Sequence, residues 1–170
     1  MDEQGVYSRG LVGRYDWKPI LAAVRRWVKD RGCGCIEVRV DDVDTEFGTR
    51  HLSPRASTLL VNASHGGETS FFLLLKPAGV RADMRNIRRA IDADSARLAS
   101  HAEIHATTQC RPGCLPPIGD LFDFPLLIDS RLASVGEIFV PSGQPGFTIL
   151  VRTRDLLRMG SVRVVSEMQD

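Results

Sequence analysis

Two histidines and two cysteines near the middle of the chain are residue types that could hold a metal ion. His101 and His105 are four residues apart, so a helix would place both on one face, and Cys110 and Cys114 follow them. Imidazole and thiolate together suit tetrahedral zinc. However, this C-x-x-x-C spacing is looser than C-x-x-C, and the other two cysteines lie far away in the sequence. We therefore predict buried thiols and exposed imidazoles, with no metal and no cofactor.

The loop from Arg111 to Gly119 is a stronger candidate for chemistry, because its composition makes it stiff without regular structure. Its stiffening residues are Pro112, Gly113, Pro116, Pro117 and Gly119. Glycine permits a close approach of backbone to ligand, and proline lowers the conformational entropy lost on ordering. Such a loop can hold backbone N–H groups where they bind an ester carbonyl or an oxyanion. An ordinary proline-rich turn without a ligand is the alternative.

A nucleophilic mechanism has little support in the sequence. The chain contains no G-x-S-x-G motif, P-loop, H-E-x-x-H motif or G-x-G-x-x-G motif. Cys114 lies inside the loop, but the motif offers it no histidine partner and no feature that would lower the pKa of its thiol. We therefore favour chemistry that needs no protein nucleophile.

The elements that must position this loop follow from hydrophobic periodicity. Apolar residues at helical spacing predict a helix that has Asp16 as its N-cap and ends at Gly32. Apolar runs at 57–63 and 69–76 flank Gly66 and Gly67, which predicts a β-hairpin with a tight turn. The other expected elements are a strand at 36–40, helices at 82–93 and around 100–107, a strand near 126–129, a hairpin of EIFV and FTILV, a helix capped by Thr153 and stopped at Gly160, and a last strand VRVV. We expect a solvated loop in the acidic run of Asp41, Asp42, Asp44 and Glu46.

Chain length and element types together predict the fold class. A length of 170 residues suits one domain, so we expect residues 1–170 to form a single compact domain. Several hairpins with only a few helices favour an α/β fold of the α+β type over a regular parallel sheet. We expect a mixed, mostly antiparallel sheet that curls like a barrel around its core, with helices surrounding it.

The charge balance excludes one class of partner. Lysine and arginine total 22 against 21 aspartates and glutamates, a net charge of +1, which excludes the global positive field of a non-specific DNA binder. Contact with nucleic acid must then be local, and the helix at 82–93 carries Arg85, Arg88 and Arg89 off its apolar face. A solvated helix surface is the alternative. The chain lacks both an apolar run of about 20 residues and a signal-peptide pattern, so we expect a cytoplasmic protein without membrane contact.

From about Ser57 to Val165 the order of these features resembles the YbaK/EbsC-like family, the prolyl-tRNA synthetase-associated editing domains and free-standing aminoacyl-tRNA deacylases. The matching stretches are STLLV, FFLLLKPAG, MRNIRRAI, RLASHAEIHATTQCRPGCLPPIG, PLLIDSRLA, EIFVPSGQPGFTI and RDLLRM. The resemblance implies a YbaK-like fold and hydrolysis of the ester that joins a mischarged amino acid to tRNA. It also implies a small pocket for residues such as alanine, cysteine or serine, and aminoacyl-tRNA as partner, with tRNA-Pro one candidate.

The resemblance further implies roles for individual residues. Gly113 begins a segment that fits the family's G-x-x-x-P loop, where its backbone would bind the ester carbonyl or the amino acid. Ser57 and Thr148 would orient water or the ribose. The other implied residues are Cys114, Leu115, Pro116, Pro117, Ser142 and Gly143 at the substrate, and Arg85, Arg88 and Arg89 at the tRNA phosphates.

The sequence departs from the family pattern on two strands. Members commonly carry a lysine at the start of the strand that here begins at Ser57, whereas Lys76 ends the next strand and is expected to be exposed. If the site is an impaired version of the family site, Ser57→Lys would restore a missing cation and speed hydrolysis. If the pocket is rebuilt around Ser57 for another substrate, the new lysine would bury a charge without a partner and lower both stability and activity. Pro141 and Thr148 stand where the cysteine-editing branch tends to have serine and aspartate. A general aminoacyl-tRNA deacylase is therefore favoured over a Cys-tRNA deacylase.

Two other functions stay open at this point. A catalytically silent module would keep the fold and bind aminoacyl-tRNA without hydrolysing it. A related hydrolase would act on another small acyl or aminoacyl substrate. The sequence identifies neither the amino acid nor the oligomeric state, a weak homodimer included.

Overall fold

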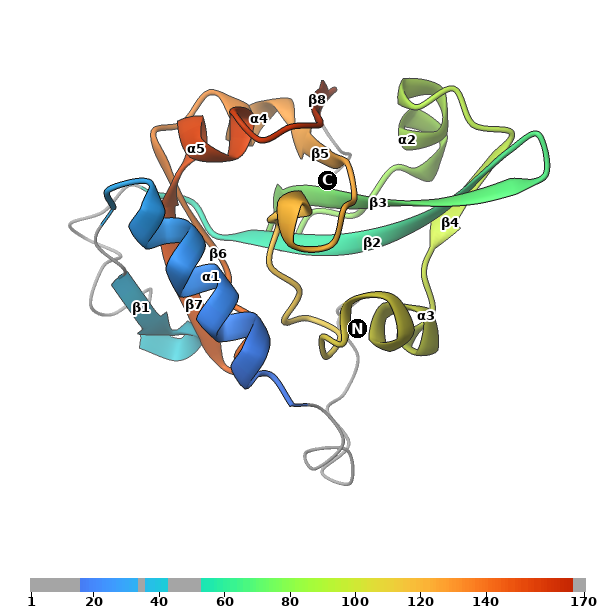
Figure 1. The fold of residues 1–170 in the computed structure, drawn as a ribbon. Coiled ribbons are helices and arrows are strands. Elements are labelled where there is room, and N and C mark those ends of the chain that lie inside the picture. The colour runs from blue at the N-terminus through green and yellow to red at the C-terminus, as the bar shows by residue number, and fades with distance from the viewer. Residues whose placement is uncertain (1–15, 34–35, 43–52, 167–170) are drawn as a thin grey trace.

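The strands of this computed structural model form two β-sheets, and the structure describes residues 16–33, 36–42 and 53–166 (Figure 1). Within these residues the larger sheet has the strand order β4-β2-β3-β5-β8 and the smaller sheet the order β1-β7-β6. The strands are β1 Ile36–Arg39, β2 Ala56–His65, β3 Glu68–Pro77, β4 Ser95–Leu98, β5 Leu126–Asp129, β6 Glu137–Pro141, β7 Phe147–Arg152 and β8 Val162–Val165. The helices are α1 Lys18–Asp30, α2 Met84–Ala90, α3 His101–Thr108, α4 Ser130–Ala133 and α5 Thr153–Leu157.

The expected fold class, a mixed α/β fold with mostly antiparallel strands, is confirmed. Four strand pairs are antiparallel, and β5 pairs in parallel with both β3 and β8. The strands of the described residues do not close into one continuous barrel. Instead, the two sheets meet at a bridge between Arg55 and Phe139, just before β2 begins. This meeting point, the seam between the sheets, is where the candidate site lies.

The hairpin of β2 and β3 is the centre of the larger sheet and confirms the sequence prediction. Its register runs without interruption from Ala56 opposite Pro77 to His65 opposite Glu68. Gly66 and Gly67 make the turn with φ of 57° and 85°, a left-handed conformation that glycine adopts without steric cost. The predicted turn therefore fixes which residues of the two strands face each other.

Helix α1 packs on the smaller sheet, as Figure 1 shows in blue beside β6 and β7. Its buried side chains join the main core with residues of both strands: Val24, Trp27, Val28, Ile138, Val140, Ile149 and Val151. The predicted helix is confirmed, but its N-cap is Trp17, not Asp16. The carboxylate of Asp16 accepts a hydrogen bond from the backbone N–H of Lys18 at 3.2 Å.

Helices α2 and α3 lie on opposite sides of β2 and β3 (Figure 1). Ile87 of α2 packs with Val61, Leu74 and other residues of a second core, whereas Ile104 of α3 packs against the main core. Asp83 caps α2 by accepting hydrogen bonds from the two backbone N–H groups at 85 and 86. The alternation of side chains along β2 explains how one strand serves both cores.

Some elements differ from the sequence predictions. Strand β4 and helix α4 were not predicted, and α5 is shorter than expected. Thr153 does not cap α5, because Arg152 holds that position and the Thr153 hydroxyl has no hydrogen-bond partner among the described residues. Asp41 lies in a short 3-10 turn at Val40–Asp42, whereas the rest of the acidic run, from residue 43 on, lies outside the described residues. None of the described helices is long and apolar enough to cross a membrane.

Candidate active site

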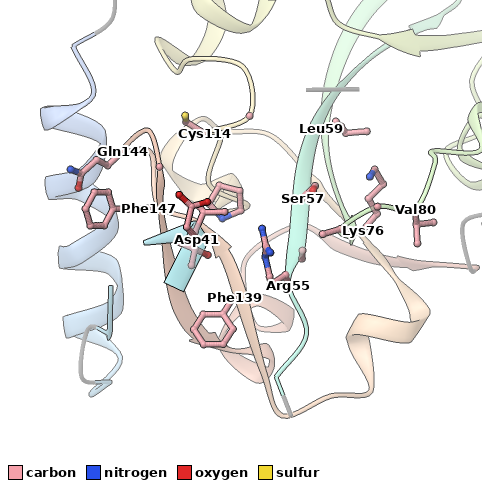
Figure 2. A pocket seen from close by; sticks show the side chains of 18 of the residues that line it. Asp41, Arg55, Ser57, Leu59, Lys76, Val80, Cys114, Phe139, Gln144 and Phe147 are labelled. Carbon is pink, nitrogen blue, oxygen red and sulfur yellow. The ribbon is translucent and has the colours of Figure 1, made fainter. Parts of the chain in front are cut away.

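A cavity of about 560 Å³ lies at the seam between the two sheets (Figure 2). Strands of both sheets line it, together with the glycine-containing loop before Pro116 and the segment that leads into α2. The lining residues used below are Asp41, Arg55, Ser57, Lys76, Arg81, Gly113, Cys114 and Thr148. The cavity therefore joins segments that are far apart in the sequence.

Four of the predicted substrate-site residues line this cavity: Ser57, Gly113, Cys114 and Thr148. Ser57 is largely buried at the start of β2. The Thr148 hydroxyl donates a hydrogen bond to the Val140 carbonyl at 2.7 Å, so towards a ligand its oxygen acts as an acceptor. The predicted grouping of the Gly113 loop with the start of β2 is thus present in the structure.

The other predicted substrate residues do not line this cavity. Leu115, Pro116 and Pro117 are buried, and Leu115 borders a separate space of about 60 Å³ beside Gly113. The Ser142 hydroxyl is fully buried, donates to the Phe147 carbonyl and accepts from the backbone N–H of residue 144. Gly143 faces α1, where an added Cβ would lie 2.7 Å from the Ile20 side chain. These residues shape the loop and the β6–β7 turn.

The loop that carries Gly113 is held in a defined conformation. Gly113 has φ of 83°, and the backbone N–H of Cys114 donates to the Arg111 carbonyl at 3.0 Å. Further along, a Cβ on Gly119 would clash with the backbone oxygen of Phe124, so only glycine fits there. The loop is therefore anchored at both ends, which agrees with the stiffness expected from its sequence.

The structure corrects the prediction that Lys76 is an exposed strand-end lysine. Lys76 is 4% exposed and lines the cavity. It lies directly opposite Ser57 in the register of β2 and β3. Facing residues of an antiparallel pair place their side chains on the same side of the sheet, about 5 Å apart at Cβ. The cavity thus contains a lysine on β3 beside the serine on β2.

The charged residues of the cavity lining are mostly basic. Arg55, Lys76 and Arg81 carry positive charge, and Asp41 is the acidic residue among the described lining residues. Asp41 and Arg81 are exposed, whereas Lys76 is buried. A local excess of positive charge in a nearly neutral chain suits a ligand that carries a phosphate or develops negative charge.

The family model for the aminoacyl-tRNA editing domain matches residues 42–159, more than half of the chain and almost all of the cavity lining. The chain belongs to this family. The resemblance to the YbaK/EbsC-like proteins is thereby confirmed.

Solved structures share the fold of this chain. One, described as a proposed trans-editing enzyme for prolyl tRNA synthetase, aligns with a TM-score of 0.70 and 19% identity over 90% of this chain and 98% of that chain. Hypothetical protein APE2540 aligns with a TM-score of 0.70 and 20% identity over 86% of this chain and 99% of that chain. At these identities the likeness concerns the fold. No curated protein matches this chain by sequence.

The thiol in the loop of this editing domain is protonated at neutral pH. Burial raises the pKa of Cys114 to about 11, against a smaller lowering effect of the Arg111 charge. Burial likewise raises the pKa of Cys110 to about 12. Because the thiolate is the nucleophile, the structure argues against covalent catalysis by Cys114.

We expect Cys114 in the folded protein to resist alkylation by iodoacetamide at pH 7.5, because a thiol with a pKa near 11 is almost entirely protonated there. The measurement is mass spectrometry of the peptide that contains Cys114, with a denatured sample as the fully reactive control. Modification of the folded protein as fast as the denatured one would reinstate Cys114 as a candidate nucleophile.

The four residues considered as metal ligands lie in different environments. His101 and His105 are exposed on α3, whereas Cys110 and Cys114 are buried in the protein. In the part of the chain that the structure describes, no group of three or more histidine, cysteine, aspartate or glutamate side chains is placed to hold a metal ion.

The arginines of α2 do not line the cavity, but they follow a lining residue closely in the sequence. Arg85, Arg88 and Arg89 are exposed, and Arg81, which lines the cavity, precedes α2. A helix with three exposed arginines therefore begins shortly after Arg81, a basic residue of the cavity lining.

Proposed function

We propose that this editing domain is an aminoacyl-tRNA deacylase that acts in trans, hydrolysing the ester of a mischarged small amino acid. The observation that carries this proposal is the cavity that joins the Gly113 loop to Ser57. Family membership supports an aminoacyl-tRNA substrate, and the similar structure described as a trans-editing enzyme supports action in trans.

The proposed reaction needs positioning more than a nucleophile, because an aminoacyl ester is already activated. The loop at Gly113 offers a backbone N–H to the ester carbonyl, while the N–H of Cys114 is bonded to the Arg111 carbonyl. Water adds to the carbonyl carbon, the bond to the ribose oxygen breaks, and that oxygen takes a proton. The products are the free amino acid and tRNA. Ser57 and Thr148 orient the water or the ribose hydroxyl, with the Thr148 oxygen as acceptor.

The proposed partner is the acceptor end of tRNA. Arg85, Arg88 and Arg89 on α2 would contact its phosphates, beside Arg81 at the cavity rim. We take tRNA-Pro as the first tRNA to test, because the similar structure is described with prolyl tRNA synthetase. We place the protein in the cytoplasm, where aminoacyl-tRNA is made and used.

The experiment that tests this function is incubation of the purified protein with tRNA-Pro charged with alanine, serine or cysteine. We expect at least one ester to be hydrolysed well above its spontaneous rate, with heat-inactivated protein as the control. Tight binding without hydrolysis would instead identify a catalytically silent binding module. If the protein neither hydrolyses nor binds aminoacyl-tRNA, that result would contradict an aminoacyl-tRNA substrate. It would favour another small acyl ester as the substrate.

A further inference from the structure

We propose that Thr58 and the small space beside it bind the side chain of the substrate's amino acid and select a side chain with a hydroxyl group, that of serine. This inference rests on the proposed function and names the amino acid that the same site prefers. Its basis is a buried hydroxyl that has no hydrogen-bond partner among the described residues and that lies next to the Gly113 loop.

The space that Thr58 lines is the smaller one, of about 60 Å³, and we call it the side pocket. Ser57 lines the main cavity, whereas Thr58 lines the side pocket, because neighbouring side chains of a strand point to opposite faces of the sheet. Residues of α3 line the side pocket as well, so it lies on the α3 side of β2 (Figure 1). Gly113 lines both spaces. The loop that we assign to the ester carbonyl therefore borders the side pocket too.

The strands around β2 leave a gap beside Thr58. β3 pairs with β2 along its whole length. β4 pairs with β2 only over Val61–Ser64, and β6 meets the chain at Arg55, just before β2 begins. At Thr58 no strand of the described residues joins the edge of β2 that faces away from β3. The Gly113 loop and the side pocket therefore occupy a gap between the strands that adjoin β2.

An ester at the loop brings its amino acid side chain to this gap. The Cα atom of an amino acid is bonded directly to the ester carbonyl carbon, so a carbonyl bound at Gly113 keeps the side chain close to the loop. The side chain then enters the side pocket, while the terminal ribose stays in the main cavity.

The hydroxyl of Thr58 indicates what kind of group the side pocket binds. Thr58 is 4% exposed, and its hydroxyl oxygen has no hydrogen-bond partner among the described residues. Leaving a buried hydroxyl unpaired costs free energy, whereas valine would have the same shape without that cost. A ligand hydroxyl, which both donates and accepts hydrogen bonds, would satisfy it. The buried threonine therefore favours a polar ligand group over a purely apolar one.

The size and lining of the side pocket favour serine. Its volume equals that of roughly two water molecules in the liquid, which suits the carbon and the oxygen of a serine side chain. Thr58 and the exposed His101 are the described lining residues with polar side chains, and apolar residues such as Leu60, Ile104 and Leu115 form other parts of the wall. The methyl group of alanine would fill only part of this space and leave the Thr58 hydroxyl unpaired.

The test compares hydrolysis of the seryl and alanyl esters of the same tRNA, each divided by its spontaneous rate because the two esters differ in reactivity. We expect the parent protein to prefer the seryl ester by about tenfold in kcat/KM, the size of effect of one net hydrogen bond. Thr58→Val should abolish this preference and leave the rate on the alanyl ester nearly unchanged. Thr58→Ser should keep most of the preference, because it retains the hydroxyl.

The matched control is Thr153→Val. Thr153 is also buried, and its hydroxyl likewise has no hydrogen-bond partner among the described residues, but it lines neither the main cavity nor the side pocket. This variant should retain the full preference for the seryl ester. The melting temperature of both valine variants should stay equal or rise, since an unpaired buried hydroxyl is replaced by a methyl group. An equal loss on both esters in Thr58→Val, or a marked fall in its melting temperature, would assign its hydroxyl a structural role and overturn the inference.

The inference and the proposed function fail in distinguishable ways. If the parent hydrolyses both esters without a preference for serine, the selection by Thr58 is excluded while the deacylase function stands. If the parent hydrolyses neither ester, the proposed function fails, and calorimetry still tests the side pocket with stable analogues in which serine or alanine is joined by an amide bond to 3′-amino-3′-deoxyadenosine. We then expect tighter binding of the seryl analogue, a difference that Thr58→Val removes. Equal binding of the two analogues by the parent would overturn the inference.

Discussion

Gly113→Val is expected to slow hydrolysis of aminoacyl-tRNA by about 100-fold or more, the size of effect seen when a backbone or side-chain donor to an oxyanion is lost. Gly113 has φ of 83°, a conformation that a β-branched residue adopts only under strain. The loop would relieve that strain by shifting its backbone. The N–H that we assign to the ester carbonyl would then leave its position at the cavity wall.

Backbone strain alone also destabilises the protein, so this prediction needs a matched control. Gly67 has φ of 85°, nearly the value at Gly113, and a Cβ added there would meet nothing within 4 Å. It lies in the β2–β3 turn and does not line the cavity. Both valine variants should lose about 1–2 kcal/mol of stability from the left-handed backbone.

The measurement is the single-turnover rate of hydrolysis beside the melting temperature for both variants. Gly67→Val should remain nearly as active as the parent at a temperature where both are folded. If the two variants lose similar stability and similar activity, the Gly113 loop has no special part in the reaction. A large loss of activity confined to Gly113→Val would support its role at the ester.

Local patterns in the sequence were sufficient for much of the fold. Helix α1 and the β2–β3 hairpin follow from periodicity and from a two-glycine turn, which are signals carried by neighbouring residues. Strand β4 and the division into two sheets depend on pairing between distant segments. β4 is only four residues long, and its pairing with β2 is set by tertiary contacts. Short segments of this kind carry too little periodicity to be assigned alone.

The same distinction, between local patterns and contacts of distant segments, explains which parts of the candidate site could be predicted from the sequence. The loop at Gly113 was recognisable from its glycine and proline content. The sequence alone did not show that Gly143, which was also predicted to contact the substrate, lies outside the cavity. The contact of Gly143 with Ile20 depends on how α1 packs against the β6–β7 turn, which no local pattern encodes. Lys76 is an intermediate case. Counting back from the turn at Gly66 and Gly67 pairs Lys76 with Ser57, so its place on the sheet was predictable. Its burial was not, because burial depends on the segments that close the cavity.

The position of Lys76 favours one of the two results expected for Ser57→Lys, the loss of stability. The other result, faster hydrolysis, assumed that the substitution supplies a missing cation, but the cavity already holds a lysine directly opposite residue 57. Two lysines facing each other across a strand pair repel, and both positions are at most 5% exposed. We expect Ser57→Lys to lose about 3 kcal/mol of stability, typical of an uncompensated buried charge. Its melting temperature should fall by roughly 10 °C.

The double variant Ser57→Lys with Lys76→Ser separates charge repulsion from loss of the Ser57 hydroxyl. It moves the lysine of this strand pair from β3 to β2 without changing the number of charges in the cavity. If repulsion causes the damage, the double variant should recover most of the lost melting temperature, and its rate of aminoacyl-tRNA hydrolysis should return to within about tenfold of the parent rate. Thermal unfolding and single-turnover hydrolysis of aminoacyl-tRNA measure both effects. If the double variant is no more stable than Ser57→Lys alone, crowding by the longer side chain, and not its charge, limits residue 57, and this strand pair tolerates a lysine only on β3.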